Sequence, residues 1–161
     1  MLKVTSDVDD PRGNVLCQEV ELRCAFDPND KQAFPIREDM LALDSIPLIY
    51  TIRFQNTGND TAFKVVLIDT LSSLLDISSF IPGVSSHPYT TSFGGRAVKF
   101  TFDPISLIDS RTNEPASHGF VTFKIKHNAN INPKSKIENN ADIYFDFNAP
   151  IRTNTVFNTI F

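Results

Sequence analysis

The feature that most constrains the fold of this chain is a recurrent alternation of apolar and polar residues, with almost no helical periodicity. Between residues 119 and 127, Val121, Phe123 and Ile125 fall on one face, and hydroxyl or lysine side chains fall on the other. Successive side chains of a β-strand point to opposite faces of the sheet, so this pattern predicts a strand with one buried face. The chain is therefore predicted to be all-β.

The same reasoning locates the other strands. We expect strands at residues 31–34, 48–56, 62–70, 89–93, 96–102, 119–127, 137–147 and 155–161, and isolated helical turns at 39–44 and 72–76. Gly94 and Gly95 predict a tight hairpin, because glycine adopts the positive φ that such turns require. Seven to eight short, mostly antiparallel strands with turn-rich connections predict an immunoglobulin-like β-sandwich.

Alternation also predicts which residues form the core. The side chains expected on inward faces include Phe54, Phe100, Phe123, Ile143 and Phe145. In the strand at 137–147, Phe147 would face the same way as Phe145. The chain has fourteen phenylalanines and no tryptophan, so phenylalanine rings are expected to dominate the predicted core.

Composition excludes some classes of partner. The chain has 161 residues, 41% of them apolar and 21% charged, as in an ordinary soluble domain. The net charge is −4, and the lysines and arginines are scattered along the sequence, so no basic patch that would bind nucleic acid is expected. No apolar run reaches the roughly 18 residues that a membrane-spanning helix needs, so we expect no membrane insertion.

The first 26 residues differ from the rest of the chain. DVDDPRGNVLCQEVEL at 7–22 is a polar turn followed by a strand, and DFNAPIRTNTVFNTI at 146–160 has the same pattern. We therefore predict that residues 1–26 are a linker or the closing strand of a preceding module, and that residues 27–161 form the sandwich. Cys17 and Cys24 are too far apart for a CxxC motif, and both a bridge between them and two free thiols stay open.

No enzyme motif stands out, and we predict that the chain is not an enzyme. None of the three histidines lies in a zinc-binding pattern. Glu114, Ser117 and His118 are the residue types of a catalytic triad. However, neighbouring residues of an extended chain point to opposite faces, so Ser117 and His118 are not expected to meet. Hydrogen bonds to the loop backbone are the simpler interpretation.

Calcium is the metal that the loops favour, because it binds six to eight hard oxygen ligands. In an immunoglobulin-like sandwich, the start of the first strand and the loop at 56–60 are expected at one end. The candidate ligands there are Asp27, Asn29, Asp30, Asn56, Asn59 and Asp60. We expect the loop at 127–136 at the same end, and Glu114, Asp146 and Asn148 at the opposite end. The alternative is turn chemistry, in which Asp and Asn side chains cap their own backbone.

A carbohydrate- or protein-binding site would need exposed aromatic platforms. Tyr50 falls on a core face, which leaves Tyr89 and Tyr144 as the candidate platforms.

Five segments in the same order carry a family resemblance. They are FDPNDK (26–31), YTIRFQNTGNDTAF (50–63), Asp69-Thr70-Leu71, NEPASHGFVTFKI (113–125) and IENNADIYFDFNAPIRTNTVFNTI (137–160). Together they resemble the conserved-repeat, immunoglobulin-like module of secreted Bacteroidota proteins, which commonly stands next to a type IX secretion sorting domain. The resemblance covers about residues 26–161.

The resemblance implies a setting more than a mechanism. It implies a secreted or cell-surface parent protein in which this module is a spacer, stalk or adhesion unit between neighbouring domains, with a surface glycan or protein as a further partner. The alternative function is a carbohydrate- or protein-binding module, stabilised by calcium.

Lys31 and Asn139 also raise the question of a covalent crosslink within the chain. Some surface immunoglobulin-like domains join a first-strand lysine to a last-strand asparagine with the help of a buried acid. Lys31 and Asn139 have suitable positions, but no acid is clearly placed on the inward face of a neighbouring strand. We therefore expect Lys31 to be a solvated charge at a strand end.

Overall fold

A computed structural model describes residues 3–9, 15–21, 28–35 and 46–160. Apart from one short 3₁₀ helix, η1 (Pro115–Ser117), its regular elements are strands. The strands are β1 (Lys3–Asp9), β2 (Val15–Glu21), β3 (Asp30–Phe34), β4 (Leu48–Gln55), β5 (Val65–Thr70), β6 (Leu75–Ser85), β7 (Thr90–Gly94), β8 (Ala97–Phe102), β9 (His118–His127), β10 (Lys136–Asn139), β11 (Ala141–Phe145), β12 (Ile151–Arg152) and β13 (Val156–Thr159). Within the described residues, no helix has the length and apolarity to cross a membrane.

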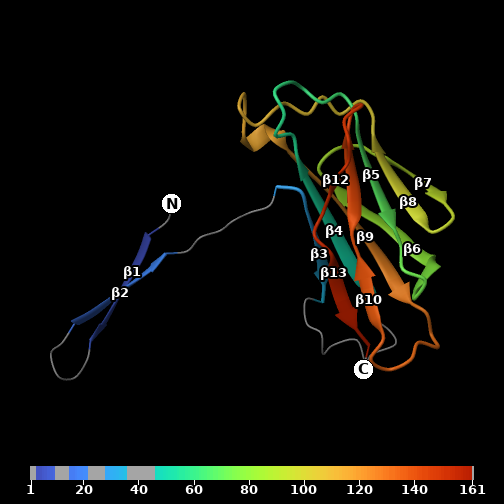
Figure 1. Ribbon diagram of the computed structural model, residues 1–161, viewed down its shortest axis with the longest axis horizontal. Helices are drawn as coiled ribbons and strands as arrows, with labels where there is room; N and C mark the ends of the chain where they lie inside the picture. Colours follow the sequence, from blue (N-terminus) through green and yellow to red (C-terminus); the bar gives the residue numbers. More distant parts are fainter. Residues whose placement is uncertain (1–2, 10–14, 22–27, 36–45, 161) are drawn as a thin grey trace.

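Two antiparallel sheets form the sandwich (Figure 1). One has the strand order β3-β4-β9-β6, and the other has the order β12-β11-β5-β8-β7. Strands β10 and β13 form a two-stranded sheet of their own, and β10 leads almost directly into β11. The prediction of an all-β, immunoglobulin-like sandwich is confirmed.

The core forms because the alternating apolar faces of the two sheets are turned toward each other. In β4, Leu48, Tyr50, Ile52 and Phe54 are fully buried. Rings also meet across the gap, since the centroid of Phe123 in β9 lies 5.6 Å from that of Phe100 in β8. All five residues predicted for the core are buried: Phe54, Phe100, Phe123, Ile143 and Phe145.

The hairpin prediction at Gly94 and Gly95 is also confirmed. Gly94 in β7 pairs with Ala97 in β8, and Gly95 has a φ of 61°. Glycine adopts this backbone conformation without the steric cost that other residues incur.

Strand β6 was missed by the sequence analysis, which expected a helical turn at 72–76. Its residues do not alternate cleanly, and Pro82 and Gly83 interrupt it. The pairing of β6 with β9 has two register shifts. At Gly83 a Cβ atom would lie only 2.4 Å from Thr122 Oγ1, so close approach of the two backbones requires glycine there.

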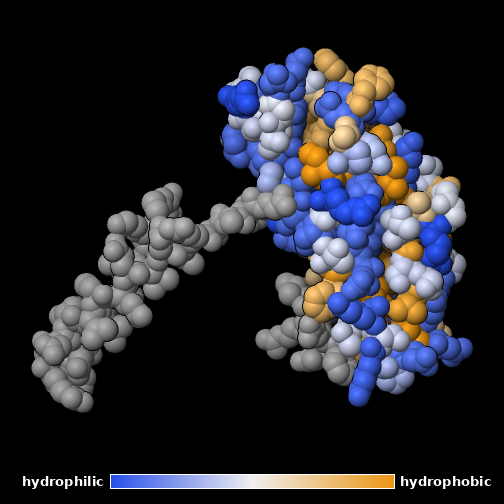
Figure 2. All heavy atoms as spheres, viewed as in Figure 1, coloured by the Kyte–Doolittle hydropathy of each residue, from blue (hydrophilic) through white to orange (hydrophobic). Residues whose placement is uncertain are grey.

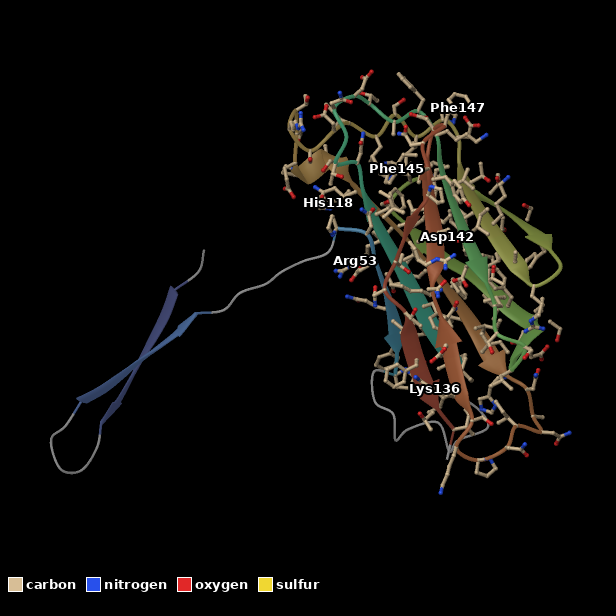
Figure 3. The ribbon with its side chains drawn as sticks, in the orientation of Figure 1. Arg53, His118, Lys136, Asp142, Phe145 and Phe147 are labelled. Carbon is tan, nitrogen blue, oxygen red and sulfur yellow. The ribbon has the colours of Figure 1, made fainter. Side chains whose placement is uncertain are left out.

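The expectation that Phe147 faces inward is wrong. Strand β11 ends at Phe145, and Asp146 has a φ of 49°, which turns the chain. Phe147 is therefore fully exposed at one end of the sandwich (Figure 3). Figure 2 shows apolar surface at this end, on a face that is otherwise largely hydrophilic.

The N-terminal segment contains two strands rather than one. Strands β1 and β2 pair with each other from Lys3–Glu21 to Asp9–Val15 and, within the described residues, with no strand of the sandwich. The division into residues 1–26 and 27–161 stays a prediction. Cys17 lies in β2, and Cys24 lies outside the described residues, as does the helical turn expected at 39–44.

The packing of Phe123 gives a stability prediction. Its ring contacts those of Tyr50, Phe80 and Phe100, so Phe123→Ala removes apolar contact and leaves a cavity. We expect chemical denaturation to show a loss of about 3–5 kcal/mol. The control Phe147→Ala, at a fully exposed ring, should change stability by less than about 0.5 kcal/mol. Similar losses for the two variants would contradict this description of the core.

Candidate functional site

A cluster of polar side chains lies in the apolar interior between the sheets. Its members are Lys31 of β3, Tyr50 of β4, Asp69 of β5 and Asn139 of β10, each no more than 2% exposed. Lysine and aspartate are almost never fully buried unless they are paired. The cluster is therefore the most unusual chemical feature of the described residues.

The strand registers explain why these residues converge. In β5, Val65, Leu67 and Asp69 share the buried face by alternation. Asp69 pairs with Ala141, and Asn139, two residues before Ala141, is likewise buried. Lys31 belongs to the opposite sheet, where it pairs with Ile52 of β4. The cluster thus links the first strand of the sandwich to the opposite sheet and to β10.

Lys31 and Asp69 form a buried ion pair in which Lys31 Nζ donates to Asp69 Oδ2. The ammonium nitrogen also lies 4.8 Å from the ring centroid of Tyr50 and 5.5 Å from that of Phe123. Aromatic faces attract a cation at such distances but do not accept its hydrogen bonds as water does. Lys31 is thus held against one carboxylate in a largely apolar environment.

Several polar atoms of the cluster make no hydrogen bond within the described residues. They are Asp69 Oδ1, the Tyr50 hydroxyl, and both Nδ2 and Oδ1 of Asn139. Burial raises the pKa of both Asp69 and Tyr50, and the nearby Asn139 side chain opposes each shift. Buried polar groups are normally hydrogen-bonded, and each exception has a cost of about 1–3 kcal/mol.

Burial also alters protonation in the cluster. It raises the pKa of the Asp69 carboxyl, against the opposing influence of the Lys31 ammonium and the Asn139 amide. It lowers the pKa of the Lys31 amine, against the opposing influence of Asp69. Both shifts favour the uncharged forms, because a low-dielectric interior disfavours isolated charge. The proton shared by the pair can therefore reside on the carboxyl and leave the amine neutral.

Two expectations from the sequence are corrected here. Lys31 is not a solvated strand-end charge, because its position in β3 faces the core. An inward-facing acid does exist, and it is Asp69. The alternation of Val65, Leu67 and Asp69 is the signal in the sequence that points to this acid.

The loops predicted to bind calcium lie next to each other, but several of their candidate ligand side chains already make other interactions. Asn29 Oδ1 accepts a hydrogen bond from the backbone of Gln55, which brings the start of β3 next to the loop at 56–60. The Asp30 carboxylate is paired with Arg53. Asp27 lies outside the described residues.

The loop side chains make turn interactions. Asn56 Nδ2 donates to the carbonyls of Asp60 and Leu107 at 2.8 and 2.9 Å, while its Oδ1 accepts from the Gly58 amide. Asp60 Oδ1 accepts from the Thr61 amide at 2.7 Å. In the part of the chain that the structure describes, no three His, Cys, Asp or Glu residues gather as a metal site. Calcium binding stays a prediction.

The predicted division of loops between the two ends was wrong. The backbone amide of Asn56 donates to the Ser117 carbonyl, and the Asp146 carboxylate accepts from the backbone amides of Phe63 and Lys64. The loops that contain Asn56, Ser117 and Asp146 therefore lie at the same end of the sandwich. The loop at 127–136 lies at the other end. Figure 3 shows His118 and Phe147 at one end and Lys136 at the other. The loop at 113–118 is carried to the first end by β9, which is antiparallel to β4.

Glu114, Ser117 and His118 do not form a catalytic triad. Ser117 is buried, and its hydroxyl donates to the Glu114 carbonyl at 2.7 Å and accepts from Gln55 Nε2 at 2.9 Å. His118 is exposed, and its Nε2 lies 2.7 Å from Glu114 Oε1. The serine hydroxyl is thus engaged by the loop backbone and Gln55, as the simpler interpretation expected.

The two candidate aromatic platforms differ in placement. The Tyr89 ring packs on Phe100 and Phe102, and its hydroxyl donates to the Gly83 carbonyl at 2.7 Å, so it belongs to the edge of the core. Tyr144 is half-buried in β11. A ligand role for either remains a prediction.

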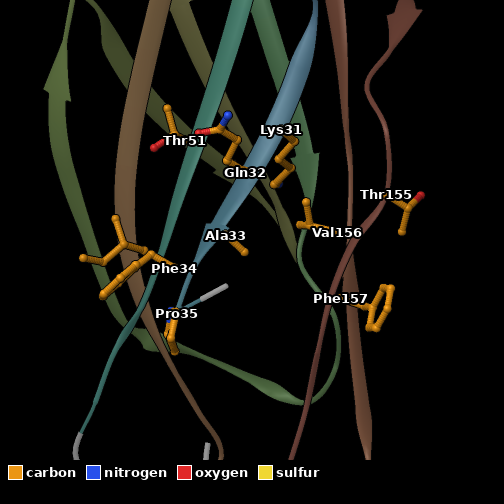
Figure 4. Close-up of a pocket in the computed structure, with 10 residues that line it drawn as sticks. Lys31, Gln32, Ala33, Phe34, Pro35, Thr51, Thr155, Val156 and Phe157 are labelled. Atoms are coloured by element: carbon orange, nitrogen blue, oxygen red, sulfur yellow. The ribbon is translucent and has the colours of Figure 1, made fainter. Parts of the chain in front are cut away.

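A surface pocket of about 590 Å³ lies between β3 and β13 (Figure 4). Phe34 and Phe157, at its rim, are 58% and 42% exposed. The sequence analysis missed this pocket, because it forms only where the first and last strands of the sandwich come side by side.

The calcium prediction is tested by melting the chain with millimolar calcium and with chelator. A cation that binds only the folded state adds about 2.7 kcal/mol when free ligand exceeds its Kd a hundredfold. We expect a rise in Tm with calcium that Asp27→Ala and Asp30→Ala each abolish, while the control Glu138→Ala keeps it. If the wild type has the same melting curve with calcium and with chelator, these loop residues only stabilise turns. A shift that survives both substitutions would move the site to Glu114, Asp146 and Asn148.

Solved structures with the same fold come from bacterial pili. BcpA, the major pilin subunit of Bacillus cereus, has a TM-score of 0.59 and 15% identity, over 98% of this chain and 48% of that chain. The Corynebacterium diphtheriae major pilin SpaA, described with a modular pilus assembly and stabilizing isopeptide bonds, has a TM-score of 0.53 and 10% identity. That match covers 96% of this chain and 44% of that one.

This chain therefore spans about half the length of these pilins, and the likeness at such identity concerns the fold. None of the curated proteins matches it in sequence. A family profile, described as a domain of unknown function, DUF7619, matches residues 27–159. Since the match covers most of the sequence, the chain belongs to the DUF7619 family.

Proposed function

We propose that this chain is a non-catalytic structural module of a larger secreted or cell-surface protein, in which it separates or presents neighbouring domains. The observation that carries the proposal is the course of the chain. Strand β3 begins toward the end where β4 finishes, and β13 finishes at the opposite end (Figure 1). A module of this kind adds its length to a stalk, because the chain enters near one end and leaves at the other.

Side-chain amides hold these two strands together. Asn154 Oδ1 accepts from the Lys31 amide at 2.8 Å, and Asn154 Nδ2 donates to the Lys31 carbonyl at 3.0 Å. Asn158 Nδ2 donates to the Pro35 carbonyl at 3.0 Å. Lys31 contacts Asn154 and Pro35 contacts Asn158, so residue numbers increase in the same direction along β3 and β13, and the two strands run parallel. Tension on the two ends would load these contacts in shear, which suits a spacer.

The fold comparisons are consistent with this role. The major pilins BcpA and SpaA each contain a region with the same fold, and SpaA is described with a modular pilus assembly. The resemblance to conserved-repeat modules leads us to propose, further, a Bacteroidota parent protein exported through type IX secretion. Neighbouring domains of the same polypeptide are the first partners that this role requires.

A second candidate function is the binding of a surface glycan or protein, and the pocket between β3 and β13 is the observation that favours it. Exposed aromatic rings beside a pocket are the usual means of stacking on a sugar ring or packing on a peptide. Phe34 and Phe157 supply such rings here.

The structural role predicts a measurable contribution from Asn154. Asn154→Ala removes both hydrogen bonds to Lys31, so we expect a loss of about 1–3 kcal/mol in unfolding free energy. The control Asn140→Ala, which removes a single exposed contact with Thr155, should have little effect. Single-molecule pulling on the ends of the chain tests the role itself. A module that extends at no greater force than an unfolded chain would contradict the spacer proposal.

The binding alternative predicts that a glycan array and a panel of host matrix proteins contain a ligand. If they do, Phe157→Ala should weaken binding about fivefold or more, since a stacked aromatic contact contributes on the order of 1 kcal/mol or more. Phe147→Ala, at the end of the sandwich, is the matched control. Binding that Phe157→Ala and Phe34→Ala both leave unchanged would exclude this pocket.

A further inference from the structure

We propose that Lys31 and Asn139 become joined by an amide bond between Lys31 Nζ and Asn139 Cγ, in a reaction that the chain performs on itself with Asp69 as the acid and base. The bond would tie β3 of one sheet to β10, beside β5 of the other sheet. It is an inference about the chemistry of the buried cluster, and it does not depend on the proposed spacer function.

The first support is placement. Lys31 and Asn139 come from strands far apart in the sequence, yet both are buried beside Asp69. Lys31 Nζ donates to one oxygen of Asp69, and Asn139 lies two residues before Ala141, which is the register partner of Asp69. A nucleophile, an acid and an amide electrophile are thus gathered in one water-poor site, as intramolecular reaction requires.

The second support is the condition of the cluster without the bond. A buried ion pair alone is weak evidence of stabilisation, because desolvation offsets its attraction. The pair also leaves Asp69 Oδ1 and both polar atoms of the Asn139 amide without partners in the described residues. Joining Lys31 to Asn139 removes the lysine charge and the unpartnered NH₂ group together. The product amide and a protonated Asp69 are neutral groups that suit this interior.

The reaction balances with no further reactant. Asp69 first takes a proton from the Lys31 ammonium, which leaves a neutral amine and a neutral carboxylic acid. The amine nitrogen attacks Asn139 Cγ while the Asp69 carboxyl donates a hydrogen bond to Asn139 Oδ1 and stabilises the oxyanion that develops. Asp69 then relays a proton from Nζ to Nδ2. The Cγ–Nδ2 bond breaks, neutral ammonia leaves, and Asp69 keeps the proton that it took from the Lys31 ammonium.

The surroundings favour the reactive protonation states. The rings of Tyr50 and Phe123 flank Lys31 Nζ and exclude water from it. Burial lowers the pKa of the amine and raises that of the carboxyl, so both shifts favour the neutral pair. An exposed lysine of ordinary pKa would remain protonated and would not attack an amide.

The bond would change how the module carries tension. It connects β3 directly to the paired strands β10 and β13, in which Asn139 pairs with Val156. Force that enters through β3 would cross to Asn139 at the bond, so the chain between residues 31 and 139 would not be stretched. Most of the sandwich would then remain folded under a load that breaks the contacts between β3 and β13.

The test is the intact mass of the purified, folded chain. We expect a mass lower than that of the sequence by one ammonia molecule. Trypsin should then leave Lys31 uncleaved and release residues 24–37 joined to residues 137–152, the peptide that contains Asn139. The branched peptide distinguishes the crosslink from a cyclised asparagine, which loses the same mass within one peptide. A folded wild-type chain of full mass would overturn the proposal.

Variants assign the roles. Lys31→Met and Asn139→Ala remove the two reacting groups, and each should restore the full mass expected for its sequence. Asp69→Asn keeps both reacting groups and nearly the shape of the acid, and it should also show full mass while folded. The control Asn140→Ala should still lose ammonia. Ammonia loss in Asp69→Asn equal to that of the wild type would remove Asp69 from the mechanism.

Stability gives an independent readout. The bond closes a loop of more than one hundred residues, and crosslinks of that length restrict the unfolded chain strongly. We expect Asn139→Ala to melt about 10 °C or more below the wild type. Lys31→Met removes the lysine charge together with the bond and leaves Asp69 to remain protonated, and it should melt lower as well. Wild-type melting in Lys31→Met would contradict a bond that stabilises the fold.

Discussion

Contact between aromatic rings of the two sheets creates the interior on which the other features depend. Phe123 in β9 meets Tyr50 within its own sheet and Phe100 from the facing sheet, with centroid distances of 5.2 and 5.6 Å. Phe54 meets Phe102 across the same gap at 5.2 Å. Packing of this kind excludes water along the length of the sandwich. Any polar group that a strand register turns inward must find its partner inside the protein.

The Lys31, Asp69 and Asn139 cluster is the main consequence of that constraint. Near water these three side chains would be an ordinary surface cation, anion and amide. Between the sheets, burial shifts both pKa values toward the neutral forms and leaves the Asn139 amide without a hydrogen bond among the described residues. Low polarity and close confinement make the ion pair unfavourable, because the buried charges lose their hydration. The same two properties favour formation of an amide bond, because they hold neutral reacting groups close together.

The same arrangement relates chemistry to a mechanical role. The first and last strands of the sandwich run parallel and, among the described residues, are joined by the side-chain amides of Asn154 and Asn158 and not by a backbone ladder. Such contacts are few, so the junction of β3 and β13 is where tension would act first. The proposed bond lies beside this junction, and it would reinforce the connection of β3 to the rest of the sandwich.

The amino-acid sequence by itself determined the fold class, most strand positions and the inward aromatic residues, because period two is a local property that the order of residues displays directly. It did not reveal β6, whose position depends on pairing with β9 through bulges, nor the outward turn at Asp146 that exposes Phe147. The buried cluster and the pocket beside β13 were decided only by tertiary structure. Lys31, Asp69 and Asn139 lie on three strands distant in sequence, and only the register of those strands and the packing of the sheets bring them together.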